Sequence, residues 1–280
     1  MIIAVTGSSG FVGREIINAL KKGNDTVLEI DLLTGIDITR VEDCHSIPRF
    51  DIMLHLAAKV FVPDSYKKPE EFYFTNFVGT LNMLELCRKN NARFIYVSSY
   101  VYGVPKYVPI DENHPLMAFN PYADTKIMCE ELCRSYNKFF NIKTIIVRPT
   151  NIYGKGQNEN FLLSSILKQA KTGVVNLEDS KPKRDYIYID DVISAYEKII
   201  YADHLNFEII NIGSGTSYSV KEITDIFNSF FSNKLIINFS ELERPNEVQD
   251  TRSNIDKAKK ILNWKPKFSL IEGIKQMCNA

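Results

Sequence analysis

Short apolar runs alternate with amphipathic segments through the first half of this chain. The apolar runs cover residues 2–6, 27–31, 52–56, 94–99 and 143–148, and the amphipathic segments cover residues 12–22, 70–89 and 122–140. The first pattern is typical of buried strands and the second of surface helices. Because strands are uniformly apolar when helices cover both faces of a parallel sheet, the sequence predicts a doubly wound α/β fold.

After about residue 148 the alternation gives way to glycine- and asparagine-containing loops, shorter helices and isolated strands such as 186–189 and 208–212. The length of 280 residues fits one large domain or two interlocked ones. We therefore expect residues 1–150 to form one domain, to which some later segments return. Residues 151–280 are expected to form mainly a smaller C-terminal lobe.

Composition excludes several classes of partner. The 34 basic and 34 acidic side chains cancel and form no basic stripe, which argues against binding to nucleic acid. Since the sequence has neither an apolar run of about 18–20 residues nor a charged leader, we expect no membrane association and a cytoplasmic location. The five cysteines are odd in number and lack C-x-x-C spacing, so we expect reduced thiols and no metal site.

Three glycines, Gly7, Gly10 and Gly13, lie between the first expected strand and the first expected helix. This spacing allows a tight turn, close approach of the backbone to a pyrophosphate, and packing of helix on strand. Asp31, at the end of the second strand, would accept hydrogen bonds from the ribose hydroxyls of NAD and repel the 2′-phosphate of NADP. Residues 1–150 are therefore predicted to form a Rossmann-like dinucleotide-binding domain. The alternatives are an ordinary glycine turn and a turn-capping role for Asp31.

Asp37 and Ile38 follow the second strand closely. We expect them to lie against the adenine of the cofactor. Alternatively, Asp37 caps the segment that begins at Ile38.

Tyr122 and Lys126 are four residues apart in an expected helix, which places both on one face. About one such pair is expected by chance in a chain of this composition, and Tyr102 and Lys106 share the spacing across a glycine and a proline that break a helix. A tyrosine base that works near neutral pH needs its pKa lowered by about 3 units. A neighbouring ammonium and a positive nicotinamide would provide that stabilisation.

An ordered series of motifs resembles the extended short-chain dehydrogenase/reductase family of nucleotide-sugar epimerases, dehydratases and reductases. The motifs are residues 6–13 (TGSSGFVG), 55–58 (HLAA), 76–80 (NFVGT), 97–103 (VSSYVYG), 122–126 (YADTK), 148–154 (RPTNIYG), 184–191 (RDYIYIDD), 211–215 (NIGSG) and 244–248 (RPNEV). The resemblance implies NAD as cofactor and a smaller C-terminal substrate lobe. With the glycine loop, it implies cofactor contacts from Gly7, Gly10, Phe11, Val12, Gly13, Asp31, Asp37, Ile38, Leu56, Ala57, Ala58, Asn76, Tyr122 and Lys126.

The resemblance also implies catalytic roles. Tyr122 would remove a proton from a sugar hydroxyl, and Lys126 would also hold the nicotinamide ribose. A serine at the end of the preceding strand would hydrogen-bond the reacting oxygen. If the position is counted along the strand that ends near residue 99, the serine is Ser99. If it is counted back from residues 101–103 (VYG), the serine is Ser98. Asn76 is expected to be a structural or cofactor-side group rather than a catalyst.

On the substrate side the resemblance implies contacts with a nucleotide-diphosphate sugar from Asn151, Arg184 and Arg244. Guanidinium groups suit bidentate binding of phosphate, although Arg184 could instead form an ion pair with Asp185 or Asp190. We also expect a homodimer in which the helices at 70–89 and 122–140 pair between subunits. The alternative is that their apolar residues pack only inward.

The two residues that follow the expected catalytic serine argue against a dehydratase. Dehydratases of the family have an Asp-Glu pair there, because elimination needs a second acid and base, but this chain has Tyr100 and Val101. The predicted function is therefore an NAD-dependent epimerase acting at sugar C4. A 4-keto-sugar reductase is the alternative, favoured by the short chain and the compact link after Asp31. A non-catalytic NAD(H)-binding sensor or scaffold is a third possibility.

Overall fold

A computed structural model describes residues 1–240, 242 and 248–279 of the chain. The predicted substrate residue Arg244 lies outside the described residues. None of the described helices is both long and apolar enough to span a bilayer.

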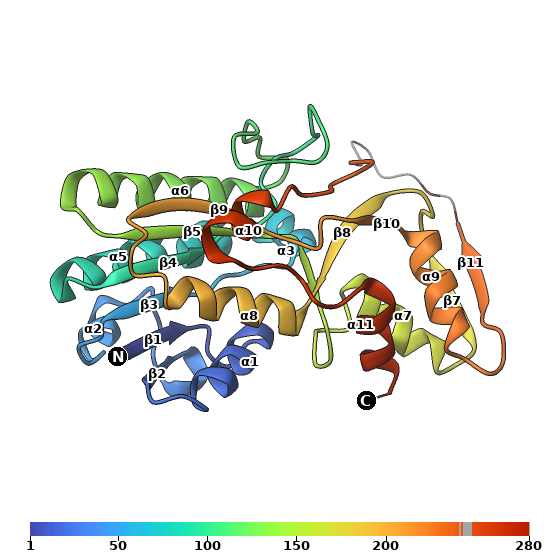
Figure 1. The fold of residues 1–280 in the computed structure, drawn as a ribbon, viewed down its shortest axis with the longest axis horizontal. Coiled ribbons are helices and arrows are strands. Elements are labelled where there is room, and N and C mark those ends of the chain that lie inside the picture. The colour runs from blue at the N-terminus through green and yellow to red at the C-terminus, as the bar shows by residue number, and fades with distance from the viewer. Residues whose placement is uncertain (241, 243–247, 280) are drawn as a thin grey trace. The chain divides into compact units, whose positions relative to one another are not determined.

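The main sheet has six strands in the order β2-β1-β3-β4-β5-β9 (Figure 1). They are β1 (Ile2–Thr6), β2 (Thr26–Ile30), β3 (Ile52–His55), β4 (Arg93–Val97), β5 (Thr144–Pro149) and β9 (Phe207–Ile212). Neighbouring strands from β2 to β5 pair in parallel. The predicted α/β fold is confirmed, but the strand expected to be isolated at 208–212 forms the sixth strand of this sheet.

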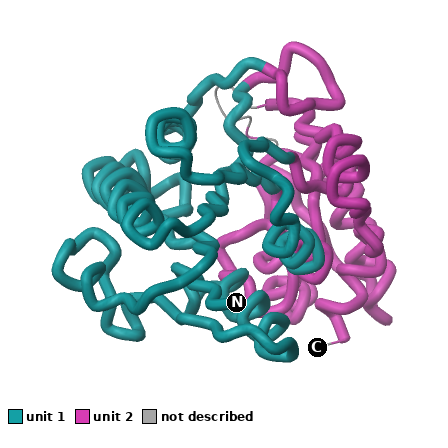
Figure 2. The backbone as a smooth tube through the Cα atoms, turned by 60° about the vertical axis from the view of Figure 1, so that its left-hand side comes forward, with its two compact units in different colours: residues 1–103, 115–149, 193–210 teal, residues 104–114, 150–192, 211–280 magenta. Residues whose placement is uncertain are grey.

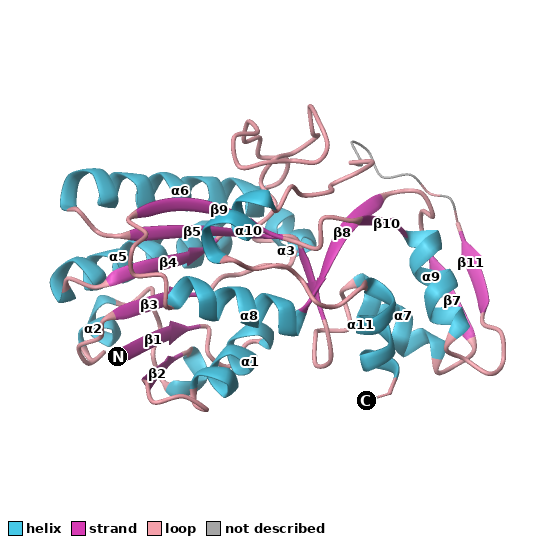
Figure 3. Ribbon diagram, in the orientation of Figure 1, coloured by secondary structure: helices cyan, strands magenta, loops and turns pink. Residues whose placement is uncertain are grey.

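Helices cover both faces of the main sheet (Figure 3). Helices α1 (Phe11–Leu20) and α8 (Ile189–Ile200) lie on one face, and α5 (Gly79–Asn90) and α6 (Pro121–Phe140) lie on the other. Strand β1 explains why both faces need cover. Ala4 belongs to the core on the α5 and α6 side, whereas Ile3 and Val5 alternate to the opposite face, and all three are fully buried.

The amphipathic segment 70–89 does not form the single helix that was predicted. It contains α4 (Pro69–Phe72), a π-helical segment η2 (Tyr73–Val78) and α5, and it is preceded by α3 (Val62–Lys67). Apolar periodicity indicates a helix but not the register of its hydrogen bonds, so it could not predict the wider π turns. The link between β2 and β3 also holds a short 3-10 turn, η1 (Leu32–Thr34), and a short helix, α2 (Val41–His45).

The chain divides into two compact units (Figure 2). The first contains residues 1–103, 115–149 and 193–210, and the second contains residues 104–114, 150–192 and 211–280. The second unit has a three-stranded sheet, β10-β8-β6, and a two-stranded sheet, β11-β7. Its elements are β6 (Asn151–Tyr153), α7 (Leu162–Ala170), β7 (Val174–Leu177), β8 (Lys183–Tyr188), β10 (Ser217–Ser219), α9 (Val220–Ser229), β11 (Ile236–Phe239), α10 (Asp256–Leu262) and α11 (Leu270–Cys278).

Candidate active site

The glycine loop connects β1 to α1 in a turn that larger residues do not fit. Gly7 has a φ of +68°, and a Cβ placed there would lie 2.8 Å from the backbone nitrogen of Ala57. A Cβ on Gly13 would lie 2.1 Å from the Gly7 carbonyl oxygen. The Thr6 hydroxyl accepts hydrogen bonds from the backbone N–H groups of Leu56 and Ala57, both at 3.1 Å. The loop is therefore held tightly against the segment that follows β3.

The start of α1 is open to an anion. Its N-cap residue is Gly10, which has no side chain to cap the N–H groups of the first turn, including those of Phe11 and Val12. The Ser8 hydroxyl in the same loop is buried and has no hydrogen-bond partner among the described residues. A diphosphate would provide acceptors for these donors, so the loop fits a dinucleotide. Sequence reasoning missed Ser8, although it lies inside the glycine motif.

Asp31 connects the glycine loop to the turn after β2. One carboxylate oxygen accepts a hydrogen bond from the backbone N–H of Ser9 at 3.2 Å, and the other accepts one from Leu33 at 3.0 Å. The Asp31 side chain therefore does cap the turn after β2, as the alternative interpretation of the sequence expected. The same carboxylate nevertheless lies at the loop and remains partly exposed, as a ribose-binding acid must.

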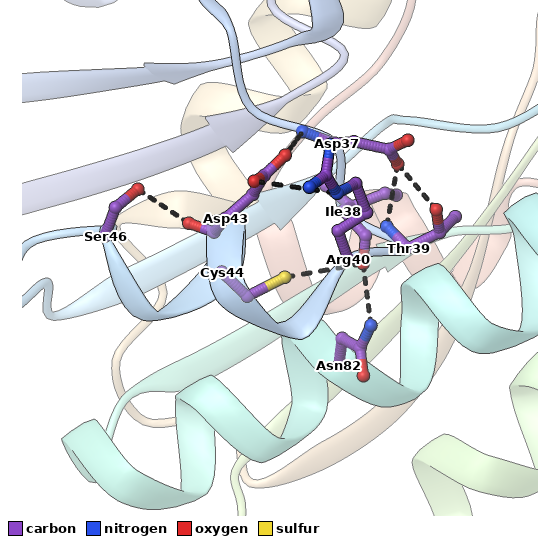
Figure 4. Close-up of polar contacts among 8 residues, drawn as sticks. All are labelled: Asp37, Ile38, Thr39, Arg40, Asp43, Cys44, Ser46 and Asn82. Carbon is purple, nitrogen blue, oxygen red and sulfur yellow. Dashed lines mark hydrogen bonds and ion pairs between the residues drawn. The ribbon is translucent and has the colours of Figure 1, made fainter.

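Asp37 and Ile38 are held by other parts of the first unit (Figure 4). The Asp37 carboxylate accepts hydrogen bonds from the backbone N–H and hydroxyl of Thr39, at 2.9 and 2.7 Å. Ile38 is 6% exposed, and its carbonyl accepts a hydrogen bond from the Asn82 amide at 2.8 Å. The capping alternative for Asp37 is therefore observed, and Ile38 has little surface left for an adenine.

Asn76 fixes the segment after β3, which contains Leu56, Ala57 and Ala58. Its amide oxygen accepts a hydrogen bond from the backbone N–H of Lys59 at 2.8 Å. Its amide nitrogen donates to the Lys59 carbonyl and to the Thr125 hydroxyl. Asn76 therefore joins this segment to α6, which is the structural role that the sequence allowed.

Tyr122 and Lys126 lie in the first two turns of α6. The helix begins where the sequence predicted, because the Asn120 side chain accepts a hydrogen bond from the backbone N–H of Ala123 at 2.7 Å. The Lys126 ammonium lies 5.9 Å from the centre of the Tyr122 ring and donates to the Val97 carbonyl at 2.8 Å. Burial lowers the pKa of Lys126 to about 8.

The two candidate serines have different partners. The Ser99 side chain lies close enough to the Tyr122 phenol to lower its pKa. The Ser98 hydroxyl instead donates to Glu130 at 2.6 Å and is buried. The geometry thus brings Ser99, Tyr122 and Lys126 together and directs Ser98 away from them.

The phenol is not ionised by its protein surroundings alone. Burial raises the pKa of Tyr122 to about 12, and the nearby Ser99 side chain opposes this rise only in part. We predicted a lowered pKa from a neighbouring ammonium together with a positive nicotinamide. The protein surroundings instead raise the pKa of Tyr122, because the cost of removing the phenolate from water is larger than the stabilisation from its polar contacts.

A buried ion pair between Glu130 and Arg148 was missed by sequence reasoning. The Arg148 guanidinium donates to Glu130 at 2.9 and 2.5 Å and to the Tyr102 hydroxyl at 3.0 Å. The two charged side chains are 1% exposed or less. Burial is the largest single influence and lowers the pKa of Arg148, but the hydrogen bonds and charges of Glu130 and Tyr102 together leave that pKa raised. An arginine within the apolar run 143–148 was the signal that could have indicated a buried partner.

The predicted substrate residues lie in the second unit, on neighbouring strands. The Asn151 amide donates to the Asp185 carbonyl at 3.0 Å, where β6 pairs with β8. The Arg184 guanidinium donates to the backbone carbonyls of Lys183 and Val248, at 2.9 and 2.5 Å. The Asp185 carboxylate is buried and accepts hydrogen bonds from the 214–215 loop and from residue 253. Asp185 thus organises this part of the second unit.

No group of three or more His, Cys, Asp or Glu side chains within the described part of the chain could hold a metal ion.

The parallel sheet, the glycine loop at an open helix start and the acid after β2 define a dinucleotide-binding protein of the Rossmann type. The tyrosine, lysine and serine beside them are suited to proton transfer.

The match of residues 3–213 shows that the chain belongs to the NAD dependent epimerase/dehydratase family. The resemblance inferred from the ordered motifs is therefore confirmed. The family's cofactor class agrees with the glycine loop described above.

Individual relatives cover nearly the whole chain. A putative UDP-glucose 4-epimerase from Methanocaldococcus jannaschii is 32% identical, over 99% of this chain and 97% of the relative. The solved structure of a UDP-glucose 4-epimerase with UDP-glucose, from Thermotoga maritima, has a TM-score of 0.90 and 25% identity, covering 100% of this chain and 98% of that one. RMD from Pseudomonas aeruginosa, complexed with NADPH, shares the fold with a TM-score of 0.91 at 24% identity, covering 99% and 97%.

Proposed function

We propose that this protein is an NAD-dependent nucleotide-sugar epimerase that transiently oxidises its substrate at sugar C4. The observation that carries the proposal is the position of the Lys126 ammonium, 5.9 Å from the centre of the Tyr122 ring, with the Ser99 side chain close enough to lower the pKa of the phenol. The names of the relatives, which include UDP-glucose 4-epimerases, support the same reaction.

The cofactor in this proposal is NAD. The open start of α1 and the unpartnered Ser8 hydroxyl would bind its diphosphate, and Asp31 would accept hydrogen bonds from the adenosine ribose. A carboxylate at that position repels a 2′-phosphate, which favours NAD over NADP. Lys126 would also hold the nicotinamide ribose. When bound, NAD⁺ supplies a hydride acceptor and a positive charge.

Tyr122 exchanges a proton with the substrate twice. In the first half of the reaction the Tyr122 phenolate would take the proton of the C4 hydroxyl, and bound NAD⁺ would supply the acceptor for the C4 hydride, which leaves a ketone. In the second half Tyr122 would return the proton to the C4 oxygen, and the reduced cofactor would supply the hydride at the opposite face of C4. Ser99 hydrogen-bonds the reacting oxygen, and the Lys126 ammonium stabilises the phenolate. The sugar is inverted at C4 with no net oxidation.

The substrate in this proposal is a nucleotide-diphosphate sugar. Asn151 and Arg184, on paired strands of the second unit, are proposed to contact it, as is Arg244. Planar guanidinium groups match phosphate oxygens in a bidentate way. A homodimer is proposed as the assembly.

A 4-keto-sugar reductase is the second candidate. The observation that favours it is the compact link between β2, which ends at Ile30, and β3, which begins at Ile52. A reductase would consume NAD(P)H with a nucleotide 4-keto sugar, whereas an epimerase regenerates its cofactor in every turnover.

The proposal is tested with purified protein to which no cofactor is added. We expect NAD to be released on heating and UDP-glucose to be converted to UDP-galactose. We expect Tyr122→Phe to lower kcat by about 10²–10⁴-fold, because the general base is lost, with NAD⁺ affinity nearly unchanged. Tyr201→Phe is the matched control, since its hydroxyl bonds Asp25 outside the site.

Several outcomes would contradict the proposal. Turnover retained by Tyr122→Phe would remove this residue from its role. Release of NADP instead of NAD would contradict the role of Asp31. Consumption of added NAD(P)H with a 4-keto sugar nucleotide, without epimerisation, would select the reductase.

A further inference from the structure

The Lys126 ammonium lies in a buried position between β4 and α6. The side chain is 3% exposed, and among the described residues the ammonium has one hydrogen bond, to the Val97 carbonyl at 2.8 Å. Two aromatic rings complete its surroundings. Its nitrogen lies 5.0 Å from the centre of the Tyr96 ring and 5.9 Å from the centre of the Tyr122 ring. A buried cation needs such compensation, because desolvation strongly disfavours its charged form.

Tyr96 is oriented by its neighbours on the sheet. It is 1% exposed on β4, and its ring stacks with those of His55 and Phe94, with centre-to-centre distances of 6.0 and 6.4 Å. Its hydroxyl has no hydrogen-bond partner of ordinary geometry among the described residues, and its polar neighbour is the Cys129 thiol. A buried hydroxyl without a partner destabilises the fold, so the hydroxyl does not account for this residue. The ring, in contrast, has a defined polar contact.

We propose that Tyr96 is a positioning residue whose ring holds the Lys126 ammonium beneath the Tyr122 phenol by a cation–π interaction. The distance of 5.0 Å is within the roughly 6 Å limit of such interactions, which are strongest where water is excluded. This inference deepens the proposed function and rests on it for its catalytic meaning. The physical interaction itself does not depend on which reaction the site performs.

The other groups that face Lys126 do not replace the ring. Burial, with a further contribution from Lys126, lowers the pKa of His55 to about 3, so that imidazole is neutral. Burial raises the pKa values of the Cys129 and Cys133 thiols on α6, which are neutral as well. The Glu130 carboxylate attracts the ammonium, but it is bound directly by Arg148. The Val97 carbonyl and the two rings therefore form the immediate environment of the charge.

The consequence concerns the protonation of Lys126 at working pH. Since burial already lowers the pKa of Lys126 to about 8, a further lowering by about 1 would leave about half of the amine neutral at pH 7. A neutral amine cannot stabilise the Tyr122 phenolate. Tyr96 would thus set the highest pH at which protonated Lys126 can stabilise the Tyr122 phenolate.

The test is a direct NMR titration of Lys126 in protein labelled with ¹³C at the lysine side-chain termini. The Lys126 signal is assigned by its loss in Lys126→Met. We expect Tyr96→Leu to lower the pKa of Lys126 by about 1, which corresponds to a desolvated cation–π interaction. Tyr96→Phe keeps the ring and should leave that pKa unchanged. Phe227→Leu is the matched control, because it removes a fully buried ring from the second unit of the chain.

A pH–rate profile tests the catalytic meaning. The alkaline limb of kcat/KM should move to lower pH in Tyr96→Leu by the same amount as the pKa of Lys126, and Tyr96→Phe should restore the wild-type profile. If the wild-type protein shows no epimerase activity, the proposed function fails while the titration still decides the interaction. An unchanged or raised pKa of Lys126 in Tyr96→Leu would overturn the inference.

A second series covers the case in which Tyr96→Leu does not fold. Phenylalanines with increasing numbers of ring fluorines are placed at position 96, which weakens the attraction of the ring for cations while its shape is nearly kept. The pKa of Lys126 should fall stepwise with fluorine number. A constant pKa across the series would refute the role of Tyr96.

Discussion

At the scale of single residues, burial favours the neutral form of both Tyr122, the proposed base, and its neighbour Lys126. It raises the pKa of Tyr122 to about 12 and lowers that of Lys126 to about 8, so both changes favour the neutral forms. The site is therefore not a preformed phenolate–ammonium pair. The added positive charge of an oxidised nicotinamide is what the proposed reaction needs in order to ionise the phenol.

Lys126 should make stability depend on pH in a way that can be measured. Its folded pKa of about 8 lies below the unfolded value of about 10.4, so the unfolded chain binds more protons between these values. The free energy of unfolding should therefore rise from pH 8 to pH 10.4 through this group, by up to about 3 kcal/mol, and this contribution is absent below pH 8.

Urea unfolding of wild type and Lys126→Met across this pH range measures the effect. We expect the variant to gain stability relative to wild type at pH 7 and to lose that advantage as the pH approaches 10.4. The exposed Lys138→Met on the same helix is the control and should show no such trend. Parallel curves for Lys126→Met and wild type would show that the ammonium is not buried as described.

At the scale of elements, the Glu130–Arg148 pair joins α6 to the ends of β4 and β5. Glu130 lies one turn after Lys126, and it also accepts the hydrogen bond of Ser98, the residue before Ser99. The position of Ser99, the proposed catalytic serine, relative to α6 therefore depends on a contact between side chains of different elements. The pair is buried, so loss of either charge leaves the other unpaired in the core.

We expect Glu130→Gln to lower the free energy of unfolding by about 3–5 kcal/mol, because it leaves Arg148 buried without its counter-ion. The double variant Glu130→Leu with Arg148→Met should regain most of that stability, since both charges are removed. Turnover should remain reduced in the double variant, because the link to Ser98 is still missing. Urea unfolding and steady-state kinetics separate the two effects. Full recovery of turnover in the double variant would show that the pair has only a structural role.

At the scale of the whole molecule, the helices expected to pair between subunits present apolar side chains to solvent. Phe74 on η2 is 54% exposed, and Phe139 and Phe140 at the end of α6 are 66% and 50% exposed. Exposed aromatic side chains are available for contact with a partner surface. They support the proposed dimer rather than purely inward packing of these helices.

Light scattering coupled to size exclusion should give twice the monomer mass of 32.1 kDa. Phe74→Lys should shift the mass toward the monomer, because it places a charge in the interface. Ile271→Lys, on α11 of the second unit and 53% exposed in wild type, should not. A monomeric wild type, or an equal effect of both variants, would contradict pairing through these helices.

Much of the first unit could be predicted because its signals are local. The predicted strand 2–6 matches β1, and the helix predicted over residues 122–140 begins one residue earlier, at Pro121, because alternation and apolar runs act over a few neighbouring positions. The π-helical segment Tyr73–Val78 was not predicted, because its pattern of side chains is that of any helix. The choice between Ser98 and Ser99 stayed open for a related reason: both fit the motif.

The amino-acid sequence by itself determined the order of strands and helices, the glycine loop and the tyrosine–lysine pair, because periodicity and backbone sterics are properties of adjacent residues. Only the tertiary structure decided that Ser99 meets the phenol, that Glu130 and Arg148 share a buried ion pair, and that β9 joins the main sheet. These features depend on contacts between distant parts of the chain. They also depend on how much water remains around each charge, which burial sets and sequence spacing does not.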